Sequence, residues 1–310
     1  MRLVTISYKR FLSTFALVLA VVVGGCGGGD ETPREVVLVT HDSFAVSQDV
    51  TRAFEAESGL KLRILKAGDA GELVTRALLT AGNPEGDVLF GVDNNLLARA
   101  LEGDVFEPYE SPALASVDPA LVLDPEHRAT PIDRGDVCLN YDKAYFASRD
   151  LPPPRDLVDL TLPRYRGLTV VENPATSTPG LAFMLATIAR FGGEWQGYWR
   201  KLRANGVLVV DGWEEAYNVR FSGSAGNGPR PIVVSYASSP PAEVIFRTPR
   251  PKSAPTGVVE RSCFRQIELA GILRGARNED GARELIDFML SRRFQEDVPS
   301  LMERPIEHRQ

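Results

Sequence analysis

Two apolar stretches of this 310-residue sequence, Val207–Val210 and Ile232–Ser235, are each followed by an aromatic residue and by polar side chains. Trp213 comes soon after the first stretch, with carboxylates on both sides, and Tyr236 directly follows the second. In α/β proteins the ends of strands commonly hold ligands, and ligand sites combine aromatic surface with a few polar groups. We therefore predict that Trp213 and Tyr236 mark a ligand-binding site, although Trp213 alone would also suit a core position beneath a helix.

Polar residues elsewhere in the sequence stand where further ligand contacts could arise. Ser177 and Thr178 precede Pro179, a residue that suits the first position of a helix. A hydroxyl there either caps the helix or contacts a ligand, and free amides at a helix start suit a hydroxyl or a phosphate. Asp42 and Asp93 each follow a predicted strand, so we expect them to bind an amine of the ligand or to cap a helix.

The residues on which most enzymes and metal sites depend are scarce in this chain. Its three histidines, His41, His127 and His308, form no pair at metal-ligand spacing, and the sequence has no GxSxG or CxxC motif. Carboxylates are plentiful, but no two are recognisable as an acid and base pair. We therefore predict a binding protein without enzymatic activity, metal or cofactor.

Strands and helices alternate in the first third of the sequence. The apolar run Glu35–Thr40 is typical of a buried strand, and the apolar positions between Val46 and Phe54 recur with helical spacing before Gly59. The alternation continues with strands at Leu60–Ala67 and Asp87–Gly91 and helices at Glu72–Thr80 and Asn94–Leu101. This order predicts a parallel sheet with right-handed crossovers.

A second series of elements follows a stretch rich in Pro, Asp and Glu, Glu107–Asp133. The predicted elements are strands at Leu168–Glu172, Val207–Val210, Ile232–Ser235 and Gln266–Ala270, and helices at Pro179–Phe191, Trp195–Asn205, Glu214–Phe221, Asp280–Ser291 and Arg293–Asp297. We interpret Ser238–Thr256, rich in Pro and Ser, as a loop. Two α/β lobes fit this order better than one sheet, with residues 35–135 and 267–310 in the first lobe and residues 136–266 in the second.

The N-terminus carries the features of an exported lipoprotein. Three basic residues precede an apolar run, Phe11–Val23, which is too short for a membrane helix but suits a secretory signal. Small residues directly before Cys26 resemble the lipobox of bacterial lipoproteins, in which the cysteine is diacylated. We predict a signal peptide over residues 1–25, a glycine-rich tether over residues 26–34, and an extracytoplasmic protein anchored to the membrane through lipidated Cys26. A plain signal peptide is the alternative.

The charge balance limits the classes of partner. The formal net charge is −6, from 41 acidic and 35 basic residues. The charged side chains of the predicted signal peptide are all basic, so its removal would make the net charge more negative. A net negative chain argues against nucleic acid as a partner and leaves room for a cationic ligand. We therefore expect a small-molecule ligand.

Four short stretches, in this order and spacing, resemble the thiamine-binding proteins of bacterial ABC importers. They are THDSFA from Thr40, GVDNNLL from Gly91, ENPATSTPGLAF from Glu172, and GWEEAY with SYASSP from Gly212. The resemblance runs from about Val36 to about Pro299. It implies a two-lobed α/β fold of the type II periplasmic-binding-protein kind with hinge crossover strands. It also implies a monomer that delivers its ligand to an ABC permease in the membrane.

The resemblance further implies which residues contact the ligand. The family's binding residues correspond here to Asp69, Ala70, Trp213, Tyr236, Ala237, Ser238, Ser239 and Pro240. Thiamine carries a permanently cationic thiazolium ring, for which the face of a tryptophan is the best aromatic partner. We therefore expect thiamine or a thiamine phosphate as the ligand.

The sequence departs from the family at three aromatic positions. The stretch Ala45–Asp49 offers no counterpart to a tryptophan that lies in a longer loop of the family. His41 stands where the family has an aromatic residue, and Pro299–Ile306 stands where it has another tryptophan. Part of the aromatic box is missing, so a different small solute remains the alternative. Ferric sites of this architecture typically use adjacent tyrosines, and SYASSP has one; a polyamine would need several carboxylates around aromatic residues.

Cys138 and Cys263 are the only cysteines besides Cys26. Outside the cytoplasm an even pair of cysteines usually forms a disulfide, with two buried free thiols as the alternative. Cys138 lies where the chain should cross into the second lobe, and Cys263 lies where it should cross back. We predict that the two crossover strands run side by side and that the cysteines are bonded.

Overall fold

The structure is a computed structural model, and it describes residues 34–223, 227–298 and 304–305. The predicted signal peptide, Cys26 and nearly all of the predicted tether lie outside the described residues, as does most of Pro299–Ile306. Within the described part of the chain, no helix combines the length and the apolar character needed to span a membrane.

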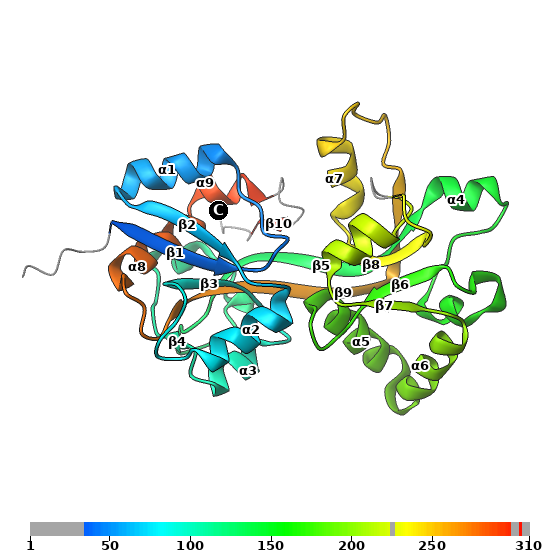
Figure 1. Cartoon of the computed structure of the whole chain (residues 1–310), viewed down its shortest axis with the longest axis horizontal. Helices are drawn as coiled ribbons and strands as arrows, with labels where there is room; N and C mark the ends of the chain where they lie inside the picture. Colours follow the sequence, from blue (N-terminus) through cyan, green and yellow to red (C-terminus); the bar gives the residue numbers. More distant parts are fainter. Residues whose placement is uncertain (1–33, 224–226, 299–303, 306–310) are drawn as a thin grey trace, which may run out of the picture. The chain divides into compact units, whose positions relative to one another are not determined.

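The strands form a single mixed sheet in the order β2-β1-β3-β9-β5-β8-β6-β7. Its strands are β1 (Glu35–Thr40), β2 (Lys61–Lys66), β3 (Val88–Asp93), β4 (Phe106–Glu107), β5 (Thr130–Asp142), β6 (Thr169–Glu172), β7 (Leu208–Val210), β8 (Ile232–Tyr236), β9 (Thr256–Leu273) and β10 (Arg304–Pro305). The outer strands on each side pair in parallel, whereas β3 with β9, β9 with β5, and β5 with β8 are antiparallel. The two longest strands, β5 and β9, therefore carry the sheet from one half of the fold into the other (Figure 1).

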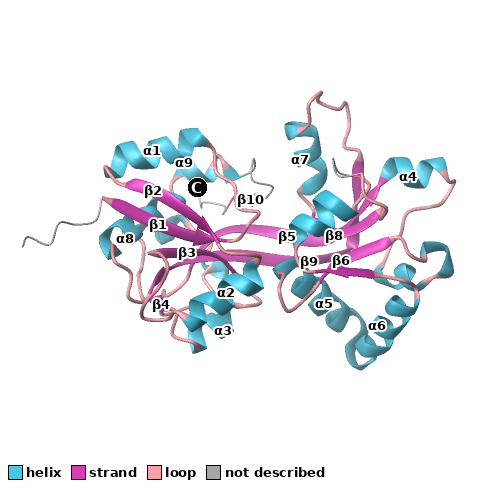
Figure 2. Ribbon diagram, in the orientation of Figure 1, coloured by secondary structure: helices cyan, strands magenta, loops and turns pink. Residues whose placement is uncertain are grey.

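Helices lie on both sides of the sheet in each half (Figure 2). The α-helices are α1 (Gln48–Ser58), α2 (Ala70–Leu79), α3 (Leu97–Glu102), α4 (Lys143–Ser148), α5 (Thr178–Phe191), α6 (Trp195–Ala204), α7 (Ser239–Phe246), α8 (Glu279–Met289) and α9 (Arg292–Gln295). Short 3-10 helices occupy Pro112–Ser116, Pro119–Leu121, Leu157–Thr161, Pro163–Tyr165 and Gly192–Glu194, and Glu215–Arg220 is a π-helix.

Separate hydrophobic cores define the two halves. One pair of clusters draws its buried residues from Val36 to Ile132 and again from Ile267 to Val298. The other pair draws them from Val137 to Val259. We call these halves the first lobe and the second lobe. Each lobe thus packs its parallel strands between its own helices, which is how apolar strand faces are usually covered in α/β proteins.

Local sequence signals explain the first-lobe helices that follow β1 and β2. The Ser47 hydroxyl accepts a hydrogen bond from the Val50 amide at the start of α1, and α1 ends at Gly59, whose φ of 74° favours glycine. The Asp69 carboxylate accepts a hydrogen bond from the Ala70 amide at the start of α2. Ser47 and Asp69 therefore mark where α1 and α2 begin, and Gly59 marks where α1 ends before strand β2.

Two predicted elements are corrected by the structure. The stretch Ser238–Thr256, predicted to be a loop, contains helix α7, because its prolines lie in the first turn, where a helix tolerates the missing amide hydrogen. The strand predicted at Gln266–Ala270 is one part of β9, which has 18 residues. Exposed and buried positions alternate irregularly along the first half of β9, so the sequence pattern marked only its buried end.

The cysteine pair links the two crossover strands. Cys138 in β5 and Cys263 in β9 form a disulfide, with Cα atoms 4.2 Å apart and a sequence separation of 125. The register between β5 and β9 shifts between Val137 and Leu139, at the position of the disulfide. The bond therefore fastens the two strands together where the chain passes between the lobes.

Candidate functional site

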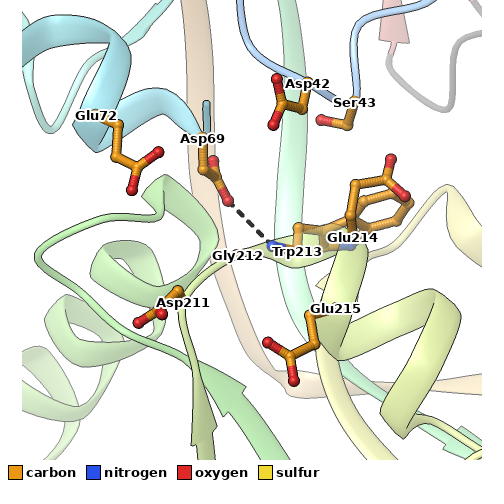
Figure 3. Close-up of a pocket in the computed structure, with 9 residues that line it drawn as sticks. All are labelled: Asp42, Ser43, Asp69, Glu72, Asp211, Gly212, Trp213, Glu214 and Glu215. Carbon is orange, nitrogen blue, oxygen red and sulfur yellow. Dashed lines mark hydrogen bonds between the residues drawn. The ribbon is translucent and has the colours of Figure 1, made fainter. Parts of the chain in front are cut away.

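A cavity of about 220 Å³ lies between the two lobes and is lined by nine residues (Figure 3). The first lobe contributes residues that follow β1 and β2, and the second lobe contributes the segment after β7. The lining residues are Asp42, Ser43, Asp69, Glu72, Asp211, Gly212, Trp213, Glu214 and Glu215. The carboxyl ends of the parallel strands of both lobes thus supply the cavity, as is usual for ligand sites in α/β folds.

The cavity wall is strongly acidic. Six of its nine residues carry carboxylates, and none carries a cationic side chain: the acidic residues are Asp42, Asp69, Glu72, Asp211, Glu214 and Glu215. Glu215 forms an ion pair with Arg220 one helical turn further on, at 2.5 Å. The Glu214 carboxylate accepts a hydrogen bond of 2.5 Å from the side-chain amide of Asn218. Such a wall attracts a cation and repels an anion.

Asp69 joins the two lobes at the cavity. Its carboxylate accepts hydrogen bonds from its own neighbour, the Ala70 amide, at 2.7 Å and from the Trp213 amide of the second lobe at 3.0 Å (Figure 3). Beside it, the Gly71 amide donates to the Thr176 carbonyl at 2.8 Å. Burial raises the pKa of Asp69, although these backbone bonds and the nearby Ser177 hydroxyl lower it in part.

A β-carbon at position 71 would meet the Thr176 carbonyl oxygen at 2.6 Å, so the approach of the two lobes at this point requires glycine. The described structure therefore has its lobes in direct contact through the main chain and through one carboxylate.

Trp213 is a buried residue that also lies in the cavity wall. It lines the cavity, yet only 7% of its surface is exposed, because its ring stacks on Tyr217 with centroids 5.0 Å apart and planes at 12°. Its indole N–H donates to the Ser235 hydroxyl at 2.9 Å, and Ser235 is in turn hydrogen-bonded to Ser239 at 2.8 Å. The ring of Tyr236 is tilted at 56° to the indole, with centroids 6.2 Å apart. The stacking on Tyr217 and the hydrogen bond to Ser235 thus fix the orientation of the indole.

The stretch Tyr236–Pro240 runs from the last residue of β8 into the first turn of α7, which begins at Ser239, and it does not line the cavity. Ser239 is fully buried, and its hydroxyl accepts a hydrogen bond from the Tyr236 amide at 3.2 Å. Pro240 is also buried, whereas Tyr236, Ala237 and Ser238 are partly exposed. The structure therefore places this stretch behind Trp213, where it supports the tryptophan.

Ser177 and Thr178 are buried at the start of α5 and do not line the cavity either. Ser177 makes no capping hydrogen bond to the helix, and its hydroxyl lies beside Asp69. The Thr178 hydroxyl accepts a hydrogen bond from the side-chain amide of Gln266 at 3.3 Å. Ala70, at the start of α2, is likewise buried and contributes only its amide to Asp69.

The two aspartates predicted at strand ends have different positions. Asp42 lines the cavity and accepts a hydrogen bond from the Gly68 amide at 3.1 Å. Asp93 is fully buried and accepts hydrogen bonds from the Asn95 and Leu96 amides, both at 3.0 Å, just before helix α3. Helix α3 itself receives no capping hydrogen bond from a side chain, so Asp93 holds the turn before the helix and does not cap it.

Four of the cavity carboxylates were not predicted as binding residues. Asp211, Glu214 and Glu215 are sequence neighbours of Trp213 and were noted only as its surroundings, and Glu72 was placed in a helix without a role. A signal for Glu72 was present, because an acidic residue three positions after Asp69 is typical of the first turn of a helix. That signal shows where the helix begins, but it does not show that the first turn faces a cavity.

A second set of acidic groups is buried behind the cavity. Glu172, the last residue of β6, is fully buried, and within the described residues neither oxygen of its carboxylate has a hydrogen-bond partner. Burial raises its pKa well above the ordinary value, and the charge of Asp69 raises it further. Burial also raises the pKa of Asp93 to about 7. The hydrogen bond from the Asn95 side chain lowers this pKa in part, and the charge of Glu268 raises it.

His41 and Glu268 form the remaining pair of titratable groups in this region, with Nε2 and Oε2 3.7 Å apart. Burial acts to lower the pKa of His41, but the charge and hydrogen bond of Glu268 outweigh it, so the pKa is raised. Among the residues that the structure describes, no group of three or more His, Cys, Asp or Glu side chains has the arrangement to hold a metal ion.

This structure has two α/β lobes that share two crossover strands and enclose a cavity between them. These features define the class of two-lobed solute-binding proteins. A family model for bacterial extracellular solute-binding proteins matches residues 83–310, and the chain belongs to this family. The arrangement is the type II periplasmic-binding-protein fold with crossover strands, as predicted. A solved structure of a periplasmic thiamin binding protein superposes with a TM-score of 0.78 at 27% identity, over 89% of this chain and 84% of that one.

The sequence relatives agree with the structural one. The thiamine-binding periplasmic protein of Salmonella typhimurium is 28% identical over 273 residues, covering 86% of this chain and 78% of that protein. The thiamine-binding periplasmic protein of Brucella abortus is 29% identical over 301 residues, covering 94% and 84%. The predicted resemblance is thus confirmed. The ferric binding protein from Campylobacter jejuni, with a TM-score of 0.70 at 19% identity over 88% of this chain and 86% of that one, shares the fold.

Proposed function

We propose that this protein is the extracytoplasmic solute-binding component of an ABC importer and that its ligand is thiamine. The acidic cavity with Trp213 in its wall is the observation that carries this proposal. A thiazolium ring has a permanent positive charge and a flat face, so it suits a site that combines carboxylates with an indole. The similarity to thiamine-binding periplasmic proteins over most of the chain supports the same ligand.

The geometry also supports a mechanism of capture by lobe closure. Both lobes contribute to the cavity, and Asp69 of the first lobe accepts the Trp213 amide of the second. A ligand that contacts both walls stabilises the closed arrangement over the open one, which is the basis of hinge closure in such proteins. The disulfide between β5 and β9 fastens the strands about which the lobes would rotate. The ligand itself is chemically unchanged.

The anchoring and the partners are part of the same proposal. Lipidation of Cys26 would hold the protein at the outer face of the membrane on its glycine-rich tether, where the closed form meets an ABC permease. One chain supplies both walls of the cavity, which supports a monomer. Mass spectrometry of Cys26 in membrane-extracted protein tests the anchor, since a free mature N-terminus without acyl chains would contradict it.

A polyamine is the second candidate ligand, and a specific observation favours it. Six carboxylates around one tryptophan could meet several ammonium groups along an extended chain. A ferric ion has less support, because within the described residues no cluster of side chains is arranged as metal ligands.

Calorimetric titration of the purified mature protein with thiamine, spermidine and ferric citrate tests these alternatives. We expect heat of binding with thiamine and a Kd in the micromolar range or below, which corresponds to about 8 kcal/mol or more. Binding of spermidine without binding of thiamine would replace the first candidate by the second. Absence of binding with thiamine and spermidine would contradict the proposed function.

A further inference from the structure

One hydroxyl in the cavity wall is hydrogen-bonded to a titratable side chain outside the wall. Ser43 lines the cavity beside Asp42 (Figure 3), and its Oγ lies 2.8 Å from Nδ1 of His41. His41 is not among the nine lining residues, and its side chain is 13% exposed. The hydroxyl of Ser43 is therefore the group through which the charge state of His41 can affect a ligand.

The ring of His41 is held by strands β3 and β9. A β-carbon at Gly91 in β3 would meet the ring at 2.5 Å, so glycine allows this close approach. The neighbouring Phe90 contacts the ring, with centroids 5.9 Å apart. On β9, the Glu268 carboxylate faces Nε2, with Oε2 at 3.7 Å. These contacts direct one ring nitrogen to Glu268 and the other to Ser43.

The carboxylate of Glu268 determines where the neutral ring keeps its hydrogen. A neutral imidazole has one N–H and one bare nitrogen, and a bare Nε2 would direct its lone pair at a carboxylate oxygen. The neutral ring of His41 therefore keeps its hydrogen on Nε2, and Nδ1 accepts a hydrogen bond from the Ser43 hydroxyl. The protonated ring carries a hydrogen on both nitrogens, so Nδ1 then donates to Ser43.

The direction of the bond between His41 and Ser43 decides what the hydroxyl offers to the cavity. When Ser43 donates to the neutral ring, its lone pairs are free to accept a hydrogen bond from a ligand. When Ser43 accepts from the protonated ring, its hydrogen is free to turn towards the cavity. An N–H group of a cation is best met by the first arrangement, in which His41 also carries no positive charge to repel the ligand.

Charged groups on the neighbouring elements act on the proton affinity of His41. Burial lowers its pKa, the charge and hydrogen bond of Glu268 and the charge of Asp69 raise it, and the charge of Lys66 lowers it. Asp93, at the end of β3, interacts electrostatically with Glu268. The pKa of His41 is raised on balance, so the ring loses its proton above about pH 6.5, the ordinary value for histidine.

We propose that His41 is a positioning residue whose charge state decides whether Ser43 offers the ligand a lone pair or a hydrogen. The proposal rests on the proposed function and adds a pH dependence to it. The neutral ring favours a cation with N–H donors, such as thiamine with its amino group. The affinity for such a ligand therefore rises as the pH rises and His41 loses its proton. By the same linkage, binding of the ligand to the protonated form releases a proton.

Calorimetry of the mature protein with thiamine at pH values from about 6 to about 8.5 tests the proposal. We expect the wild-type Kd to fall at least threefold over this range, because one net hydrogen bond is worth about that factor. Titrations in two buffers of different ionisation enthalpy should show proton release on binding. A Kd that is constant or rises with pH would overturn the proposal and leave the proposed function intact. If thiamine does not bind at any of these pH values, the proposed function itself fails.

Substitutions separate the titration of His41 from that of other groups, including Asp93. His41→Asn keeps a polar group for Ser43 but does not titrate, so its Kd should vary less than twofold over the range. Ser43→Ala, at an exposed position, serves if the first variant does not fold, and it should show a smaller pH dependence than the wild type.

The matched control removes a histidine outside the cavity wall. His127 has a φ of 55°, which asparagine tolerates, so His127→Asn should fold and keep the full pH dependence. Wild-type pH dependence in His41→Asn or in Ser43→Ala, or its loss in His127→Asn, would contradict the proposal.

Discussion

The carboxylates that line the cavity and the carboxylates buried behind it are the same chemical groups in opposite environments. Glu72, Asp211 and Glu214 are exposed at the cavity wall. Glu172 and Asp93 are fully buried, and they are the last residues of strands β6 and β3. Exposure leaves a negative charge available to a ligand, whereas burial makes the protonated form the more stable one.

The difference shows that acidity near a ligand site has two separate consequences. Carboxylates at the wall should affect how tightly a cation binds and have little effect on the stability of the fold. Buried carboxyl groups should affect the stability and its pH dependence and have little effect on affinity. Asp69 belongs to both groups, because it lines the cavity, joins the lobes and has a pKa that burial raises.

Removal of the aromatic wall should have the largest effect on binding. We expect Trp213→Ala to weaken thiamine binding more than tenfold, since a desolvated cation–π contact contributes about 2 kcal/mol. The loss of a buried indole stacked on Tyr217 should also lower the free energy of unfolding by about 3–5 kcal/mol. Calorimetry on the folded variant separates the two effects, and circular dichroism measures the second. Wild-type affinity in the variant would show that Trp213 serves the core alone.

Neutralising Glu172 should act on stability alone. We expect Glu172→Gln to raise the free energy of unfolding at pH 8 by about 1–3 kcal/mol, because the variant removes an ionisable group whose buried oxygens have no hydrogen-bond partner in the described structure. The affinity for thiamine should stay within about twofold of wild type. Urea denaturation and calorimetry measure the two quantities. A large loss of affinity with unchanged stability would move Glu172 into the group of ligand-binding carboxylates.

Asp93 should make stability depend on pH in a defined direction. Its pKa is raised from 3.8 to about 7 in the folded protein, so the folded state binds the proton more tightly than the unfolded state does. The resulting stability is fully present below about pH 4 and is lost as the pH rises towards about 7, by about 2–4 kcal/mol in total. Asp93→Asn should remove this part of the pH dependence while keeping a side-chain oxygen for the Asn95 and Leu96 amides. Denaturation at pH 4.5 and pH 7.5 measures the change in the free energy of unfolding between the two pH values. An equal change in variant and wild type would exclude Asp93 as the cause of the pH dependence.

A single carboxylate of the cavity wall should have the smallest effect. We expect Glu72→Gln to weaken thiamine binding about two- to threefold at low salt and hardly at all at about 300 mM salt, because exposed charges act through a screened field. Its melting temperature should be that of the wild type. An effect of Glu72→Gln that does not change with salt would indicate a direct contact, and a change in melting temperature would weaken the distinction between wall and buried carboxylates.

The sequence predicted the main strands and helices because their signals are local. The apolar run Glu35–Thr40 coincides with β1, and the helix expected to start near Glu72 is α2, beginning at Ala70. Helix α7 was missed because Pro and Ser are typical of both loops and first helical turns. The length of β9 was missed because its burial pattern is irregular where it passes from lobe to lobe.

The site could be predicted only in part. The position of Trp213 followed from its sequence neighbours and from the family motifs, but the cavity is formed by two segments far apart in sequence, around Asp69 and around Trp213. No pattern within either segment shows that the two meet. Asp42 and Asp93 look alike in sequence, at the end of a strand, and only the tertiary structure distinguishes an exposed wall position from a buried one before a helix.

The crystal structure of the mature protein grown with thiamine is the most direct test of the proposed site. We expect electron density for the ligand in the cavity between the lobes, with the thiazolium ring against Trp213 and near the carboxylates of Glu72 and Asp211. Ligand density elsewhere on the protein, or a thiazolium ring that contacts neither Trp213 nor these carboxylates, would contradict the assignment of the acidic cavity as the thiamine site.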